Sequence, residues 1–392
     1  MGSLLNRIAK NKSGEKDKTS DYSKESDINN IQTKPFFKEK NILATDYKYY
    51  EYTFVIEANK LSIYDIYKLK DINDSFYLAF LTFQNKKDIK ILKYNFINKT
   101  TEKVTINLPS FTIFPTKIKY FYDQIQNKEN LFILLGRKIR IFLIKNDSQY
   151  EEETNGIIIK TYNQIHDFEI IYDKYKKINY LIISKFFKLD SIKQKRISIY
   201  KFIENEIVII NEYKTRWWGF NSKRQKFLLI WENKVAQNFY LITSHYTKLK
   251  FMEISDKANE NIYDFNIISS DNCSYNEFDY FGCIIYNVNN TDYLYICNDF
   301  DALIIIDLYK KEIISKISFI KDITSIINWN QKYIIISTLK YIYTFDTKIN
   351  KIINKYLINT NGEIISIKKI NVVKNCPFSL SVDTTDGKII II

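Results

Sequence analysis

The sequence predicts an all-β protein in which a unit of an apolar strand, a short polar turn and a second apolar strand recurs along most of the chain. From about Tyr50 to Ile392, short apolar runs alternate with clusters of Asn, Asp and Lys, which is typical of strands joined by turns. The runs are dominated by Ile and Tyr, which favour strands, while the helix formers Ala and Leu are scarce. Similar runs recur at a mean interval of about 50 residues, which is the length of a repeating structural unit.

Seven apolar runs mark the repeat, although the fourth is weak. They are Ile89–Tyr94, Ile139–Ile144, Ile197–Phe202, Phe239–Ile242, Leu303–Leu308, Tyr341–Thr347 and Lys388–Ile392. Placing one unit around each run gives seven units, with an inserted loop around Ser269–Tyr280 in the fifth. The predicted units are Leu61–Leu108, Phe111–Lys160, Gln164–Tyr213, Trp217–Ile254, Ile262–Phe319, Ile323–Leu357 and Glu363–Ile392.

The clearest unit lies between Ile320 and Leu357. Its strand-like runs are Lys321–Ile326 and Tyr333–Thr338, followed by Tyr343-Thr344-Phe345-Asp346-Thr347 and then Lys348–Ile353. The preceding unit repeats this order and places Asp307 39 residues before Asp346. These two units resemble the WD40-repeat family, in which Asp346 and Asp307 would stand at the position of the Asp of the Trp-Asp dipeptide.

The resemblance implies a seven-bladed WD40-like β-propeller and also has clear departures. The chain contains no Gly-His dipeptide and no repeat with Trp-Asp. The hydrogen-bond relay that those residues form in the family is therefore missing, and we expect the blades to be held by backbone ladders and apolar packing. The seventh unit ends after its third strand, so we expect Tyr52–Ala58 to supply the outer strand and close the ring, which removes an exposed sheet edge.

Residues 1–48 differ from the rest and are predicted to be a disordered basic and polar tail, with residues 49–392 forming the single propeller. The tail mixes both charges with Ser and Asn and has few large apolar groups to offset the entropy of ordering. Gly2 is a candidate lipidation site, because N-myristoylation requires a glycine after Met1. Asn6 stands where Ser or Thr is preferred, so an unmodified terminus is the simpler alternative.

The net charge of +13 does not by itself predict a nucleic-acid partner. Only six of the 58 basic residues are Arg, the residue that reads phosphates and base edges with two parallel hydrogen bonds. Lys, Asn, Ile and Tyr all have AT-rich codons and are all abundant, so base composition can account for the Lys excess. Nucleic acid is therefore an unlikely partner. A phosphoinositide, membrane-surface or nucleic-acid-binding propeller that uses the Lys-rich surface stays open as the alternative function.

The sequence predicts no catalytic residues, no metal site and no cofactor. It lacks nucleotide-binding glycine loops and the nucleophile elbow of hydrolases. His166 and His245 are the only histidines and lie far apart, so ordinary strand-end histidines are the simpler interpretation. Glu151–Glu153 is better explained as a solvated loop. The four cysteines have no C-x-x-C spacing and are expected to be reduced structural thiols.

One cluster is a candidate protein-binding site: Arg216, Trp217, Trp218 and Arg224. Trp and Arg are enriched at the centres of protein interfaces because they bury much area and make directional polar contacts. The alternative is that both Trp side chains fill the core of the fourth unit. Since no secretory signal or membrane-spanning stretch is evident, we expect a non-catalytic scaffold that mediates protein–protein interactions in a cytoplasmic assembly.

Overall fold

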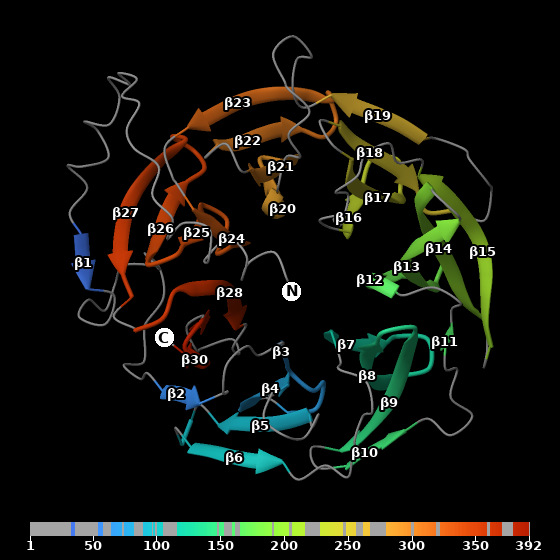
Figure 1. Cartoon of the computed structure of the whole chain (residues 1–392), viewed down its shortest axis with the longest axis horizontal. Coiled ribbons are helices and arrows are strands. Elements are labelled where there is room, and N and C mark those ends of the chain that lie inside the picture. Colours follow the sequence, from blue (N-terminus) through green and yellow to red (C-terminus); the bar gives the residue numbers. More distant parts are fainter. Residues whose placement is uncertain are drawn as a thin grey trace. The chain divides into compact units, whose positions relative to one another are not determined.

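The computed structural model confirms an all-β, seven-bladed propeller (Figure 1). The chain divides into two compact units, Met1–Gln32 and Thr33–Ile392, and the propeller is the second. The structure describes residues 33–35, 54–57, 64–72, 74–81, 89–95, 97–98, 100–104, 116–146, 149–152, 159–160, 165–189, 192–203, 206–215, 228–245, 248–255, 262–266, 280–298, 302–318, 322–358, 361–370 and 379–391. Within these ranges every regular element is a strand.

Each blade is an antiparallel sheet whose strands follow the chain from the centre of the ring outward. The innermost strands are β3 (Tyr64–Tyr67), β7 (Lys117–Asp123), β12 (Ile165–Asp173), β16 (Leu228–Asn233), β20 (Tyr280–Val288), β24 (Ile323–Asn328) and β28 (Ile364–Ile370). The second strands are β4 (Ser75–Leu81), β8 (Lys128–Leu135), β13 (Ile178–Leu189), β17 (Asn238–His245), β21 (Thr291–Asn298), β25 (Tyr333–Thr338) and β29 (Ser379–Thr384). The third strands are β5 (Ile89–Asn95), β9 (Lys138–Asn146), β14 (Ile192–Ile203), β18 (Lys248–Glu253), β22 (Ala302–Asp307), β26 (Tyr341–Asp346) and β30 (Lys388–Ile391). The outer strands are β6 (Thr100–Val104), β10 (Gln149–Glu152), β15 (Glu206–Thr215), β19 (Ile262–Asn266), β23 (Glu312–Ser318), β27 (Lys351–Leu357) and β2 (Phe54–Glu57).

The seventh blade combines strands from the two ends of the propeller. β2 pairs antiparallel with β30, so that Val55 lies opposite Ile390 and Ile56 opposite Ile389. The sheet order β2-β30-β29-β28 makes β2 the fourth strand of the blade that contains the last strand of the chain. A strand from the beginning of the propeller therefore closes the ring. The domain limits at residue 48 stay a prediction, because the neighbouring residues lie outside the described ranges.

The predicted limits of the fourth and fifth blades are wrong. Ile262–Asn266 does not begin the fifth blade; it pairs with β18 and completes the fourth, and the fifth blade begins at Tyr280. The fourth apolar run, Phe239–Ile242, lies in the second strand of its blade, while the six other runs lie in third strands. Lys248–Glu253 is the true third strand there, and its alternating charges concealed it. Thr33–Pro35, within the predicted tail, is a strand, β1, that pairs parallel with β27.

The same turn joins strands in most blades. An Asp or Asn at a strand end accepts hydrogen bonds from the backbone N–H groups two and three residues later, which is the Asx turn of short polar side chains. Asp123, Asp173 and Asn233 do so after first strands, and Asn95, Asp307 and Asp346 after third strands. In five of these turns the fourth residue has a positive φ: Asn127, Lys177, Gln237, Lys311 and Asn350. The Asn and Asp residues therefore provide the turns in a chain with only eight glycines.

Successive blades stack on one another through apolar faces. Phe132 of β8 and Phe168 of β12 belong to one buried cluster between the second and third blades. One equivalent apolar cluster lies between the first and second blades. Four more lie between successive neighbours from the third blade to the seventh. Because each strand's side chains alternate between the two faces of its sheet, each blade from the second to the sixth buries one face against the preceding blade and the other against the following one. Apolar side chains are thus buried between neighbouring blades, as expected for blades held by backbone ladders and apolar packing.

A hydrogen-bond network reinforces the joint between the fourth and fifth blades. The indole Nε1 of buried Trp231 donates to Asp292 Oδ2 at 3.0 Å, and the Tyr309 hydroxyl donates to the same oxygen at 2.9 Å. The Asn287 side chain donates to the other carboxylate oxygen at 2.6 Å. Burial and the hydrogen bond to Asp292 raise the pKa of Tyr309 to about 12. Asp292 therefore binds three donors from two blades.

Candidate binding surfaces

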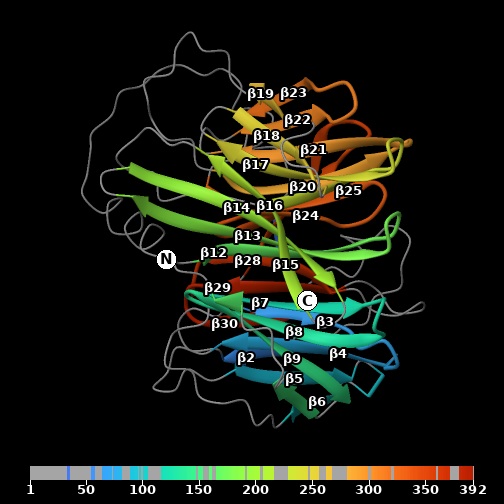
Figure 2. The ribbon, with the colours of Figure 1, turned by 90° about the vertical axis from the view of Figure 1, so that its right-hand side faces the viewer.

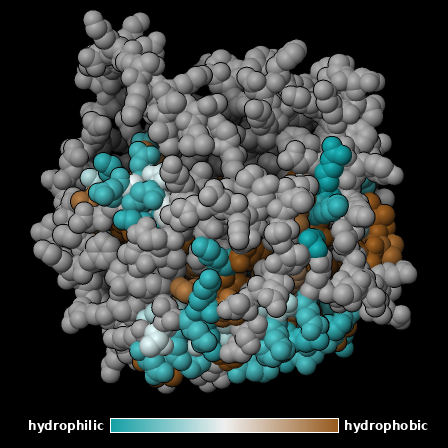
Figure 3. Space-filling model, turned by 60° about the horizontal axis from the view of Figure 1, so that its bottom comes forward, coloured by the Kyte–Doolittle hydropathy of each residue, from teal (hydrophilic) through white to brown (hydrophobic). Residues whose placement is uncertain are grey.

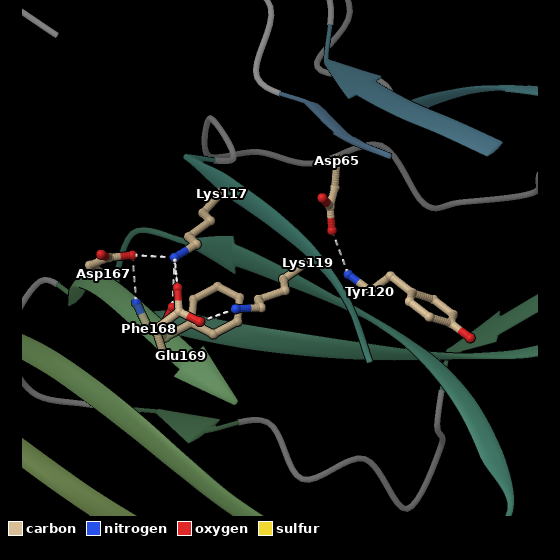
Figure 4. Close-up of polar contacts among 7 residues, drawn as sticks. All are labelled: Asp65, Lys117, Lys119, Tyr120, Asp167, Phe168 and Glu169. Carbon is tan, nitrogen blue, oxygen red and sulfur yellow. Dashed lines mark hydrogen bonds and ion pairs between the residues drawn. The ribbon is translucent and has the colours of Figure 1, made fainter. Parts of the chain in front are cut away.

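Charged side chains from three innermost strands meet in one cluster (Figure 4). Lys117 of β7 donates to Asp167 Oδ1 at 2.7 Å and to Glu169 Oε1 at 2.9 Å, and both acceptors lie on β12. Lys119, also on β7, pairs with Glu169 as well. On the other side of β7, Asp65 of β3 accepts a hydrogen bond from the Tyr120 N–H at 2.8 Å. The cluster links the first, second and third blades near the centre of the ring.

The electrostatics of this cluster fit an interblade link. Burial, together with the neighbouring charge of Lys117, lowers the pKa of Lys119 to about 8. Burial also lowers the pKa of Lys368 on β28, which interacts with Asp65 and Lys117. The lysines and the carboxylates are similar in number and partly buried, so they neutralise one another. This arrangement holds inner strands together and leaves no net charge to attract a ligand.

A second feature is the face of the ring that carries the turns. Figure 2 views the ring from its side and shows strands running across its thickness, so connections lie on its two faces. In an antiparallel sheet, the connections from first to second strand and from third to fourth strand share one face, which we call the turn face. Side-chain contacts cross this face between blades: Lys70 reaches Asn127 Oδ1 at 2.8 Å, and Tyr175 reaches Glu232 Oε1 at 2.7 Å.

The turns on this face expose aliphatic side chains at equivalent places. Ile97, Ile125, Val235 and Ile349 each stand two or three residues after the capping Asp or Asn, and their exposed fractions are 69%, 52%, 81% and 57%. They come from the first, second, fourth and sixth blades. Single exposed aliphatic residues are ordinary on protein surfaces. Their recurrence two or three residues after a capping Asp or Asn, on one face, is a regular pattern.

Lysines surround these aliphatic residues. Nine lysines within or beside the turns are exposed: Lys70, Lys174, Lys176, Lys177, Lys234, Lys310, Lys311, Lys348 and Lys351. In the described parts of the same segments, the exposed carboxylates are Asp71 and Glu312. The capping Asp side chains add little to the surface, because Asp173, Asp307 and Asp346 are buried at the strand ends. The turn face therefore combines a strong positive charge with regularly placed aliphatic groups.

The outer edge of the third blade is a third candidate surface. β15 is ten residues long, the longest outer strand among the described elements, and it lies on the outside of the ring in Figure 1. Its central run Ile207-Val208-Ile209-Ile210-Asn211 has no charge, whereas the other outer strands have at most three uncharged residues in succession. Val208 and Ile209 are 39% and 49% exposed. Figure 3 shows that apolar areas stay exposed among the hydrophilic side chains of the described surface.

A bulge distributes the apolar residues of β15 over both sides of the blade. Tyr200 lies opposite Ile209 and Ile199 opposite Asn211, which leaves Ile210 as the extra residue. Ile207 packs against the core shared with the second blade, and Ile210 against the core shared with the fourth. Among the described elements β15 pairs only with β14. The edge thus presents backbone hydrogen-bonding groups beside two exposed aliphatic residues.

The site residues predicted from the sequence lie outside the described residues. Arg216, Trp217, Trp218 and Arg224 fall between β15 and β16, and Gly2 falls in the first compact unit, so both predictions stay untested. The sequence interpretation missed β15 and the turn face. An uncharged aliphatic run directly after a third strand was the available signal for the first. The repeated spacing of Asp or Asn, an aliphatic residue and a left-handed Asn or Gln was the signal for the second.

The described residues contain two cysteines, Cys283 and Cys297. Cys283 and Cys297 are free thiols there, and burial raises the pKa of both. In the same residues no group of three or more His, Cys, Asp or Glu side chains is placed to hold a metal ion. The described segments also include no helix with the length and apolar character needed to cross a membrane.

Comparison with known proteins supports the fold at the level of architecture. No protein-family model matches the chain, and no curated protein matches it. Among solved structures, the chain is similar to BBS1N in its complex with ARL6DN, soaked with mercury: the TM-score is 0.55 with 11% identity over 86% of this chain and 94% of that one. The same complex soaked with lead gives 0.54 and 10% over the same shares. This likeness shows the propeller fold, and membership of the WD40 family stays a prediction.

Proposed function

We propose that the chain is a non-catalytic scaffold for protein–protein interactions in a cytoplasmic assembly, and that a partner protein binds along β15. The observation that carries this proposal is the long outer edge of the third blade, whose central run Ile207–Asn211 has no charge and exposes Val208 and Ile209. Soluble proteins usually protect such an edge with charges, proline or a covering segment. An edge left open with apolar residues is the type of surface that accepts another chain.

The expected mode of binding is the addition of a strand. In strand addition, main-chain hydrogen bonds provide affinity, and alternate side chains provide specificity. This ring already shows that an outer edge accepts a further strand, because β1 pairs with the outer strand β27 in a parallel register from Thr33 opposite Lys355 to Pro35 opposite Leu357. The corresponding edge of the third blade has no such cover among the described residues.

The partner segment should be extended and apolar on both of its faces. The exposed Ile209 lies on the same side of β15 as Ile207, toward the second blade. The exposed Val208 lies on the opposite side, toward the fourth blade. An added strand with successive aliphatic or aromatic residues would therefore contact both. A second copy of this chain fits less well, because two molecules that each carry a net charge of +13 repel one another.

The likeness to BBS1N supports this proposal in a limited way, since that propeller was crystallised in complex with another protein. It indicates that a ring of this architecture is compatible with a protein-binding role. The residues of the partner surface are argued from β15 alone.

The test compares the wild-type chain with V208D/I209D and with the control I314D. Ile314 lies on the outer strand β23 and is 49% exposed, so the control places a carboxylate on a similar outer edge. We expect wild type and I314D to purify with the same stoichiometric partner, which persists at high salt because the contact is apolar. V208D/I209D should lose that partner while keeping the wild-type urea midpoint.

A photoreactive amino acid at position 208 provides a second measurement that is independent of the stability of the double variant. It should crosslink to the stoichiometric partner, and the same group at position 314 should not. A partner retained by V208D/I209D, or crosslinked equally from both positions, would refute the assignment of β15. Crosslinking at position 208 only to a second copy of the chain would replace scaffolding by self-association.

A further inference from the structure

We propose that the turn face binds the surface of a membrane that contains anionic lipids, a function beyond the scaffold role of β15. The inference rests on the four exposed aliphatic residues Ile97, Ile125, Val235 and Ile349 and on the lysines around them. The aliphatic residues belong to four different blades, so they are distributed around the ring. A broad, flat surface can contact them together, whereas a small partner would cover only neighbouring blades.

The charge of the turn face fits an anionic bilayer. Nine exposed lysines stand beside two exposed carboxylates in the described turn segments. Some of these lysines already make contacts within the protein, such as Lys174 with Glu232 at 2.7 Å. The Lys310 ammonium lies 3.6 Å from the exposed carboxylate of Glu312. The N–H groups of Lys310 and Lys348 bond to Asp307 and Asp346, so the caps hold the backbone from which both side chains extend. Lysines close to anionic lipids add roughly equal increments to binding.

The aliphatic groups fit the interfacial region of the bilayer. Peripheral membrane proteins place apolar side chains between the headgroups while basic residues contact the phosphates. Val235 follows Lys234 directly, and Ile349 follows Lys348, so an aliphatic group and an ammonium group stand side by side in two turns. Since the turns are held by Asx caps and have left-handed fourth residues, their apolar tips are presented by a rigid backbone.

Nucleic acid shares the phosphate chemistry but fits this face less well. Proteins that bind single strands stack bases on exposed aromatic side chains. The aromatic residues in these turns, Tyr175 and Tyr309, use their hydroxyl groups within the protein, bonding to Glu232 and Asp292. Their rings are partly buried against neighbouring blades. Aliphatic groups at the exposed positions favour lipid.

The experiment measures sedimentation of the full chain, produced without N-terminal acylation, with vesicles of phosphatidylcholine alone or with added phosphatidylserine. The charge variant is K234E/K310E/K348E. Its control, K138E/K316E/K340E, changes the net charge equally at exposed lysines outside the turn segments. The apolar variant is I125S/V235S/I349S, and its control is V208S/I209S/I314S on outer strands.

We expect wild type to bind only the vesicles with phosphatidylserine. With about a fivefold contribution from each lysine, loss of the three lysines alone weakens binding roughly 100-fold, and the three added carboxylates should weaken it further. Its control should stay within about fivefold of wild type, because charges more distant than a Debye length are screened. The apolar variant should lose binding to the same vesicles more than its control does.

Three results would overturn the inference. Equal losses in the charge variant and its control would show that only the overall charge matters. Equal binding to neutral vesicles would remove the role of the lysines. Binding to an oligouridylate with the same sensitivity to the charge variant, without binding to vesicles, would identify the ligand as nucleic acid. Because the vesicles contain no protein, none of these results bears on the scaffold function of β15.

Discussion

Replacing Asp307 with alanine should lower the free energy of unfolding by about 2 kcal/mol. The buried Oδ1 of Asp307 accepts two backbone hydrogen bonds, from Tyr309 and Lys310, each at 2.9 Å. A hydrogen bond to a charged group contributes about 1.5–3 kcal/mol. The two contributions should not add in full, because Lys310 is exposed and water can replace the acceptor for its N–H. Asp307 was also aligned with the Trp-Asp position, so the variant measures what this aspartate does here.

The matched control is D307N, which keeps an oxygen acceptor in the same place. Asn95 and Asn233 cap equivalent turns with bonds of 3.0 to 3.1 Å, so an amide oxygen is sufficient for this geometry. D307N should therefore cost well under 1 kcal/mol relative to wild type. Urea unfolding followed by tryptophan fluorescence measures both variants, with K310A as an exposed control expected within about 0.5 kcal/mol. A D307N loss equal to that of D307A, or no loss in D307A, would refute the capping explanation.

Three further predictions concern the joints of the ring. D292A should lower the free energy of unfolding by about 3 kcal/mol or more in the same urea assay, because three donors, among them Trp231, lose their buried acceptor. A change below 1 kcal/mol would contradict the role of this network. In the folded chain the pKa values of Lys119 and Lys369 are lowered from 10.5 to about 8. Between pH 8 and about pH 10 the unfolded chain therefore binds more protons than the folded chain. The free energy of unfolding should rise with pH over this range. K119M/K369M should flatten this rise, and an unchanged pH profile would show that these groups do not cause it. A chain that begins at residue 59 lacks β2 and should unfold at a clearly lower urea concentration than one that begins at residue 36, since both lack β1 and only the longer one keeps β2. Equal midpoints would mean that pairing with β30 contributes little.

Much of the architecture could be predicted from the sequence because the third strands carry a strong signal. Runs such as Leu303–Leu308 and Tyr341–Thr347 are mostly aliphatic or aromatic and are buried at almost every position, since third strands are covered on both faces between blades. The blade Ile323–Leu357 was predicted strand by strand, because short turns separate its strands and leave little choice of pairing. The seven-bladed propeller followed from this regularity.

The fourth blade shows where the sequence interpretation reaches its limit. Its third strand, Lys248–Glu253, alternates Lys and Glu with apolar residues, so it resembles an edge strand more than a buried one. Its partner Ile262–Asn266 contains Asp264 and was assigned to the next blade. Strand pairing depends on which backbone groups meet in space, and a short run with mixed character does not determine that.

The candidate surfaces were harder to predict for a related reason. An apolar run such as Ile207–Ile210 reads as buried core, and only the position of β15 as the last strand of its blade makes Val208 and Ile209 exposed. On the turn face, Ile125 and Val235 are single residues in otherwise polar turns, and their common orientation follows from the antiparallel order of the strands. The inner cluster of Lys117, Asp167 and Glu169 likewise joins residues about 50 positions apart.

Amide hydrogen exchange on the purified complex tests the central proposal most directly. The measurement compares the exchange rate of each backbone amide in residues 206–215 between the free chain and the chain with its stoichiometric partner. Strand addition predicts slower exchange at alternate amides of β15, because an added strand bonds to every second residue of an edge. Unchanged exchange in β15, with protection elsewhere on the ring, would contradict the account.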